Sequence, residues 1–220
     1  MPFDLPRASS VLHFDTPKKR NNTRHRDIDS LLLNAGREAF IKNGIRATSM
    51  SAVARAAGVS RPTLYSRYRN IDLLTGDVLR HEYLTVLEGA FDRVTSPEQF
   101  IDQIVYVADS LRSNEFITSV AQSDPDILHH FLFGHLVGTQ RRLVDYLKRL
   151  IDAVRDQAIE QDSESRIREG DPEVLAIFVV MTVQSAILSA PAVASIVPRP
   201  DKWCLELHRL VSGYLLECKG

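Results

Sequence analysis

The spacing of apolar residues predicts helices along almost the whole chain. From Asp27 to Asn43, isoleucine, leucine, alanine and phenylalanine return every three or four positions, which places them on one helical face. The same period is found from Ile71 to Val94 and in most of the segments that follow. No useful length of sequence alternates between polar and apolar residues, as a half-buried strand would. We therefore expect an all-α protein.

Caps, glycines and prolines divide this pattern into nine expected helices. Gly44 ends the first, and Ser96 with Gln99 forms a capping box at the start of a later one. A helix that starts at Pro172 is expected to end at Ser189, before a stretch bounded by prolines. The expected helices cover residues 27–43, 48–57, 61–68, 71–94, 97–112, 115–122, 125–160, 172–189 and 200–218.

The stretch from Thr48 to Arg69 has the signals of two short helices separated by a tight turn. Gly58 can adopt the left-handed backbone that ends a helix, and Ser60 can cap the helix that follows. Pro62 falls in the first turn of that second helix, where its missing N–H does no harm. This arrangement predicts a helix-turn-helix, and an ordinary pair of antiparallel core helices is the alternative. The second helix carries arginine, tyrosine, threonine and serine but no acid, which suits contacts with DNA phosphates and base edges.

The same stretch resembles a known family. The pattern A-x-x-A-G-V-S-x-x-T-L-Y-x-x-Y, from Ala54 to Tyr68, is similar to the signature of the tetracycline-repressor (TetR) family of bacterial regulators. The similarity is specific over residues 27–80, and beyond them it is one of length and helical layout. Most members have glycine where this chain has Pro62. The resemblance implies an N-terminal three-helix DNA-binding domain with a helix-turn-helix, followed by a larger helical domain for ligand binding and dimerisation.

The resemblance also implies which residues contact DNA. Arg61 is the best candidate to read a guanine, because its guanidinium matches two acceptors, and Tyr65 is expected at a phosphate. The family usually has a phosphate-binding lysine where this chain has Ile71, and Arg67 or Arg69 could supply that charge. The full set of expected contacts is Thr48, Ser49, Met50, Ser51, Ser60, Arg61, Pro62, Thr63, Tyr65, Ser66, Tyr68 and Arg69.

Charge is divided unevenly between the two parts of the chain. Residues 1–70 carry 13 Lys and Arg against 5 Asp and Glu, whereas residues 71–220 carry 14 against 23. A basic front and an acidic remainder suggest that only the front meets a polyanion. Residues 1–26 lack helical periodicity and end in a basic run. They are either an arm that contacts DNA or a solvated tail, and the sequence favours neither.

Three regions are therefore expected: a flexible basic arm (1–26), a helix-turn-helix domain (27–70) and a helical effector-binding and dimerisation domain (71–220). One helix-turn-helix covers few bases, so a homodimer on a palindromic operator is expected. The candidate interface residues, which could also be plain core, are Phe178, Met181, Ile187, Trp203, Leu207, Leu210 and Tyr214. The candidate lining of an effector pocket, with the same alternative, is Tyr83, Leu87, Phe91, Tyr106, Phe116, Phe131, His135 and Phe178.

Other chemistries find less support in the sequence. Three histidines lie between residues 129 and 135, but no nearby cysteine or glutamate completes a tetrahedral metal site, so no metal or cofactor is expected. Residues 174–198 lack charge over nearly the span of a bilayer, but prolines and polar residues interrupt them and a dimer could bury them. Cys204 and Cys218 are expected to be reduced thiols of a cytoplasmic protein, and no signal peptide is visible.

The expected function is that of a sequence-specific transcription regulator, a repressor that leaves its operator when a small effector binds. One alternative is a non-specific or architectural DNA-binding protein, which would depend strongly on salt without preferring a sequence. The other is an enzyme that uses the helical C-terminal domain. The sequence contains no nucleophile elbow, Walker loop or dinucleotide fingerprint, which disfavours that second alternative.

Overall fold

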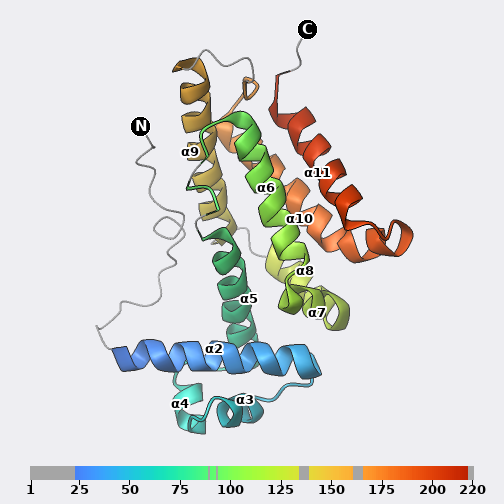
Figure 1. The fold of residues 1–220 in the computed structure, drawn as a ribbon. Coiled ribbons are helices and arrows are strands. Elements are labelled where there is room, and N and C mark those ends of the chain that lie inside the picture. The colour runs from blue at the N-terminus through green and yellow to red at the C-terminus, as the bar shows by residue number, and fades with distance from the viewer. Residues whose placement is uncertain (1–22, 89, 93, 134–138, 161–165, 218–220) are drawn as a thin grey trace. The chain divides into compact units, whose positions relative to one another are not determined.

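The computed structural model describes residues 23–88, 90–92, 94–133, 139–160 and 166–217. Ten helices account for most of these residues, which confirms the expected all-α fold (Figure 1). In chain order they are α2 (Thr23–Asn43), α3 (Met50–Ala56), α4 (Arg61–Tyr65), α5 (Ile71–Leu87), α6 (Pro97–Arg112), α7 (Glu115–Ser123), α8 (Pro125–Phe133), α9 (Thr139–Glu160), α10 (Pro172–Ile196) and α11 (Pro200–Leu215).

The described residues form two compact units. The N-terminal unit holds residues 23–85 together with 113–133, and the C-terminal unit holds the other described residues. The sequence predicted that the helix-turn-helix domain ends at residue 70, and it gave no sign that α7 and α8 return to the N-terminal unit. They do so because α7 packs against α2, which removes the apolar side of both helices from water.

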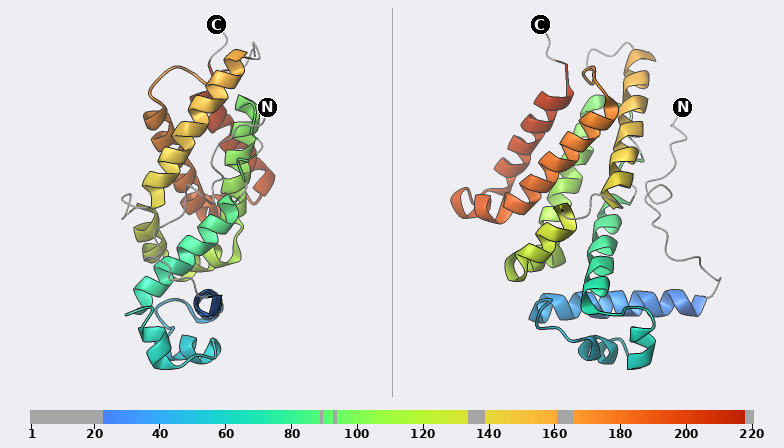
Figure 2. Two further views of the ribbon diagram at one scale, coloured as in Figure 1. Left: turned by 90° about the vertical axis from the view of Figure 1, so that its left-hand side faces the viewer. Right: turned by 180° about the vertical axis from the view of Figure 1, so that it is seen from behind.

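The N-terminal unit is built around α2. Helices α3 and α4 lie together on one side of it (Figures 1 and 2). The rings of Phe40 on α2 and Phe116 on α7 pack with their centroids 6.2 Å apart. Among the most completely buried side chains of this unit are Leu32, Phe40, Ile45, Leu64, Leu74 and Phe116. Each such side chain stabilises the fold by roughly 1.5–3 kcal/mol relative to an exposed position.

In the C-terminal unit, α10 packs against α9, α6 and α11, and α11 also packs against α6. The ring of Phe91 contacts those of Phe100 and Tyr146, with both pairs of centroids 6.1 Å apart. Burial raises the pKa of the Tyr146 hydroxyl to about 12, because it disfavours the ionised form. The predicted capping box is displaced by one residue. The Gln99 N–H donates to Ser96 Oγ, but the Gln99 side-chain oxygen accepts from the N–H of Thr95.

Several expected helix ends are wrong, and the helix expected over 71–94 already ends at Leu87. Helix α10 was expected to end at Ser189, but it continues through Pro191 to Ile196. Proline removes one backbone donor from a helix. The flanking residues Ala190, Ala192 and Ala194 strongly favour helix, which is the physical reason that α10 continues. The single helix expected over 125–160 is two helices, α8 and α9, and the residues between them lie outside the described part of the chain.

Candidate nucleic-acid interface

The helix-turn-helix forms where the sequence predicted it. Ser49 caps α3, with its Oγ accepting from the N–H of Ala52 at 3.2 Å. Gly58 makes the turn at φ 67°, a left-handed conformation that is costly for other residues. Ser60 then caps α4, with its Oγ accepting from the N–H of Thr63 at 3.3 Å. The two caps fix both helix starts through the exposed hydroxyls of short side chains.

Three side chains hold α4 and its C-terminal flank in place. Leu64 is fully buried, and Tyr68 is 7% exposed with its hydroxyl bonded to Asp77 of α5. Burial is the largest cause that raises the pKa of this tyrosine, and the nearby charges of Asp77 and Asp29 add to it. Arg67 forms an ion pair with Asp29 of α2. Helix α4 and the residues that follow it are therefore attached to both α2 and α5.

The remaining residues of this region present a polar and cationic surface. The Tyr65 side chain is 49% exposed, and the Ser66 hydroxyl donates to the carbonyl oxygen of Thr63 at 2.7 Å. Of the twelve expected DNA contacts, seven are exposed and two are partly exposed. The exposed residues are Ser49, Ser60, Arg61, Pro62, Tyr65, Ser66 and Arg69, and the partly exposed ones are Ser51 and Thr63.

The other three expected contacts need correction, because their side chains lie in the core. Thr48 is 7% exposed, and its hydroxyl donates to the carbonyl oxygen of Gly44 at 2.7 Å and to that of Ala39 at 3.2 Å. Met50 is 8% exposed, and Tyr68 is buried as described above. We therefore assign these three side chains to holding the helix-turn-helix together, and not to contact with DNA.

The charge of this region is entirely positive. No aspartate or glutamate occurs between residues 39 and 71, whereas six lysines and arginines do. Two of them, Arg46 and Arg67, form ion pairs with acids from outside this stretch. The other four, Lys42, Arg55, Arg61 and Arg69, are exposed. Of the two replacements suggested for the missing family lysine, Arg69 is thus the available one. The basic arm expected at 1–26 lies outside the described residues, apart from the first residues of α2.

The eight residues expected around an effector pocket do not all share one setting. Phe116 packs on Phe40 in the core of the N-terminal unit. Tyr83, Leu87 and Phe91 are buried, Phe131 is partly exposed, and Tyr106 and Phe178 are 62% and 54% exposed. His135 lies outside the described residues. A hollow of about 210 Å³ does occur in the C-terminal unit, lined by Arg112, Ala190, Val193, Ala194, Val197, Pro198, Arg199, Pro200 and Trp203, and none of the expected residues lines it.

The expected dimer residues divide in two. Phe178, Met181 and Leu210 are exposed, and Trp203 and Tyr214 are partly exposed. The Phe178 and Tyr214 rings lie 6.1 Å apart, so α10 and α11 share this apolar surface. Ile187 and Leu207 are only 8% and 3% exposed, because they face the core of their own chain. These two are corrected to core residues.

Comparison with known proteins agrees with this geometry. The model of the family described as bacterial regulatory proteins, tetR family, matches residues 32–75. HTH-type transcriptional regulators of Mycobacterium bovis and Mycobacterium tuberculosis are 30% identical to this chain over 191 residues, which cover 86% of the chain and 95% of each relative. This chain belongs to the TetR family. As a TetR-family protein it is a DNA-binding transcription regulator, and the stretch matched by the family model contains α3, α4 and the turn between them.

Solved structures share the fold of this TetR-family protein. A TetR-family regulator from Pectobacterium atrosepticum superposes with a TM-score of 0.69 at 21% identity, covering 91% of this chain and all of that one. SmeT, the repressor of the Stenotrophomonas maltophilia multidrug efflux pump SmeDEF, superposes with a TM-score of 0.60 at 15% identity, covering 88% of this chain and 94% of SmeT. At such identities the likeness concerns the fold alone.

Proposed function

We propose that this TetR-family protein binds a palindromic operator as a homodimer and represses transcription until a small molecule releases it. The observation that carries the DNA-binding part is the exposed cationic and hydroxyl surface of α4 on a rigid support. Arg61 and Tyr65 are exposed, while Leu64 and Tyr68 are buried and anchor the helix. A helix fixed in this way can present a guanidinium to a base edge with little loss of conformational freedom.

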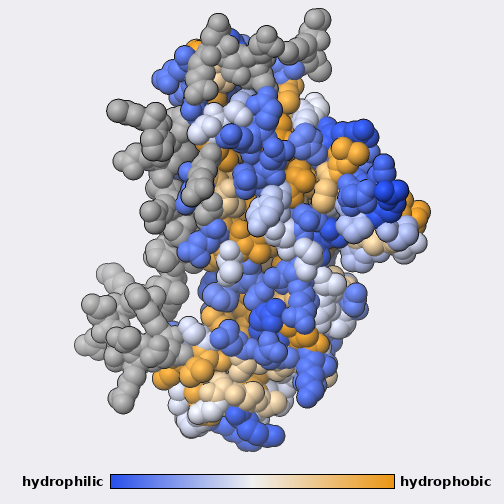
Figure 3. Space-filling model, in the orientation of Figure 1, coloured by the Kyte–Doolittle hydropathy of each residue, from blue (hydrophilic) through white to orange (hydrophobic). Residues whose placement is uncertain are grey.

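An exposed apolar face on α10 supports the homodimer. Phe178 and Ile196 are 18 residues apart, which is about five turns, so they point the same way from the helix. They are 54% and 81% exposed. Between them the same face carries Met181, Ser185, Ser189 and Ala192, all exposed. Apolar residues also reach the surface at the α10–α11 corner, on the right in Figure 3.

A second copy of the chain is the occupant that suits this face. Helix α10 is long and apolar enough to cross a bilayer, but core helices of soluble proteins meet the same criterion. One side of α10 is already packed against α9 and α6, so only its exposed face remains to be covered. Small residues in the middle of that face let another helix approach closely. Two helix-turn-helix units on a two-fold axis could then read a palindrome.

Release by a small molecule is proposed from the solved neighbours. SmeT and NalD are described as repressors of multidrug efflux pumps, and SmeT has also been solved in a complex with triclosan. The mechanism would be a shift of population, in which the effector favours a conformation of lower operator affinity. A cytoplasmic location follows from the same proposal.

A binding-site selection from random duplexes, followed by anisotropy titrations with the selected duplex, tests the DNA-binding proposal. Arg61→Ala should weaken binding by about tenfold or more, since a bidentate contact to guanine is worth roughly 1–3 kcal/mol. Arg149→Ala, an exposed arginine on α9, is the matched control and should change the affinity less than twofold. A selection that recovers no preferred sequence would favour the alternative, a non-specific DNA-binding protein. An unchanged affinity of the Arg61 variant would remove the assigned role of that residue.

A further inference from the structure

All of helix α7 lies along the C-terminal part of α2, although 71 residues separate the two helices in the sequence. Contacts recur at each turn, and the residue numbers of both helices rise together, so the helices run parallel. The contacting pairs are Arg37 with Glu115, Phe40 with Phe116, Ile41 with Ser119, and Ile45, just beyond α2, with Asp124, just beyond α7. A helix held at every turn moves with its partner as one body.

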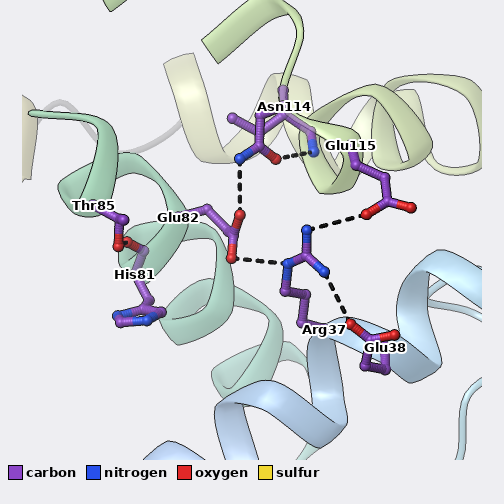
Figure 4. A network of polar contacts seen from close by, with 8 residues as sticks. Arg37, Glu38, His81, Glu82, Thr85, Asn114 and Glu115 are labelled. Atoms are coloured by element: carbon purple, nitrogen blue, oxygen red, sulfur yellow. Dashed lines mark hydrogen bonds and ion pairs between the residues drawn. The ribbon is translucent and has the colours of Figure 1, made fainter. Parts of the chain in front are cut away.

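The first attachment point is Arg37, which joins three helices (Figure 4). Its Nε donates to Glu82 of α5 at 3.1 Å, and its Nη2 donates to Glu115 of α7 at 3.3 Å. Asn114, the cap of α7, donates from its amide nitrogen to the second oxygen of Glu82 at 2.8 Å. Burial lowers the pKa of the Arg37 guanidinium, but the attraction of Glu82 and hydrogen bonds to Glu115 and Glu38 outweigh it and raise the pKa. The Arg37 guanidinium thus stays charged and is held in place by the surrounding glutamates.

The second attachment point is Asp124, the residue between α7 and α8. Its side chain is 3% exposed, and its Oδ2 accepts from the backbone N–H of Ile45 and from the Ser123 hydroxyl, each at 2.9 Å. Gly44 has φ 79°, and a Cβ added there would lie 3.4 Å from the same oxygen. Arg46 Nε lies 3.8 Å from the other carboxylate oxygen. The Asp124 carboxylate therefore fixes the conformation of the loop between α2 and α3 through its contacts with Ile45 and Arg46.

This loop leads directly to the DNA-reading helices. Ile45 is 2% exposed, and Ser49, only four residues later, is the cap of α3. The Thr48 hydroxyl ties the end of the loop back to the carbonyl oxygen of Gly44. A shift of Asp124 would consequently be passed to the start of α3 through a short, internally bonded segment.

We propose that α7 positions the helix-turn-helix for DNA binding, with Arg37 and Asp124 as positioning residues. In this view the Asp124 carboxylate fixes the loop before α3 and Arg37 fixes the start of α7, so both residues set the position of the helix-turn-helix from outside it. Helix α6 ends at Arg112 and α7 begins at Glu115, so a change in the C-terminal unit enters α7 through two residues of chain. This inference rests on the proposed function.

The test compares Asp124→Ala with two matched variants. Asp124→Ala removes the acceptor of the buried Ile45 N–H and should lower affinity for the selected operator duplex by about tenfold. Asp124→Asn keeps an oxygen acceptor and should restore affinity to within about threefold of the wild type. Asp126→Ala removes only the exposed ion pair with Arg46 and should change the affinity less than about twofold. All titrations are made at a temperature where circular dichroism shows each variant folded, so lower stability alone would leave the affinity unchanged.

Hydrogen exchange on the wild-type protein provides a second readout that needs no variant to fold. The amides of Glu115–Ser123 should exchange more slowly when the selected operator duplex is bound than with a scrambled duplex of equal length. Unchanged exchange in α7, or full operator affinity of folded Asp124→Ala, would overturn the inference while leaving the proposed function intact. Failure of the selection to recover any operator would instead count against the proposed function.

Discussion

At the scale of single residues, burial separates the side chains that we propose to contact DNA from those that hold the helix-turn-helix together. The resemblance placed Thr48, Met50 and Tyr68 among the contacts, because the pattern aligns positions and does not show direction. In the structure all three face inward, whereas Arg61 and Tyr65 face outward. Tyr68 lies four residues after Leu64, and the sequence predicts that Leu64 and part of Tyr68 face the core.

Thr48 gives a prediction at this scale. Thr48→Val keeps the shape of the side chain but leaves the carbonyl oxygens of Gly44 and Ala39 without its hydroxyl. The free energy of unfolding should fall by about 1–2 kcal/mol in urea denaturation. Operator affinity of the folded protein should stay within about twofold of the wild type. Unchanged stability together with weaker operator binding would instead indicate that the Thr48 hydroxyl contacts DNA.

At the scale of elements, the turn between α3 and α4 was predictable in detail because local chemistry decides it. Gly58, Ser60 and Pro62 each constrain the backbone through their own atoms, and the structure uses all three as expected. The end of α10 was not predictable in this way, since Pro191 signals a break that the neighbouring alanines override.

Gly58 supplies the prediction for this element. Gly58→Ala should lower the free energy of unfolding by about 1 kcal/mol, because alanine resists the left-handed conformation and no neighbouring atom lies within 4 Å to add a clash. Gly76→Ala on α5 is a matched control with equal free space and an ordinary helical backbone. It should raise stability by up to about 1 kcal/mol, as measured by the same urea titration. Effects of the same sign in both variants would contradict the argument.

The placement of α7 shows why the packing of helices that are distant in the sequence could not be predicted from the sequence. The apolar side of α7 predicts that this helix is buried, but not which neighbour buries it. Arg37 and Asp124 meet partners that are 45 and 79 residues away in the chain. Contacts at such separations have no local signature. The predicted effector pocket was uncertain for the same reason, because an aromatic such as Phe116 fits a core as well as a cavity.

At the scale of the whole molecule, the exposed face of α10 is the surface that the proposed homodimer would cover. Ile196→Glu places a charge on this face and should produce monomers in sedimentation velocity, whereas the wild type should sediment at twice the mass of one chain. Affinity for a palindromic operator should fall about tenfold or more, because the two half-sites are no longer bound as a unit. Ile159→Glu on α9, with 63% exposure, is the matched control and should remain dimeric. A wild-type monomer at working concentration would contradict the proposed assembly.

The contact between α6 and α11 has a practical consequence. Trp203 is the single tryptophan of the chain, and the guanidinium of Arg112 lies 4.9 Å from the centre of its ring. Arg112 is also the last residue of α6, three positions before the start of α7, the helix that packs against α2. A cation over an indole ring alters the fluorescence of the tryptophan. The fluorescence of Trp203 should therefore report on the position of Arg112, close to where the chain passes from one unit to the other. A rearrangement at the end of α6 can thus be followed by tryptophan fluorescence in the unlabelled wild-type protein.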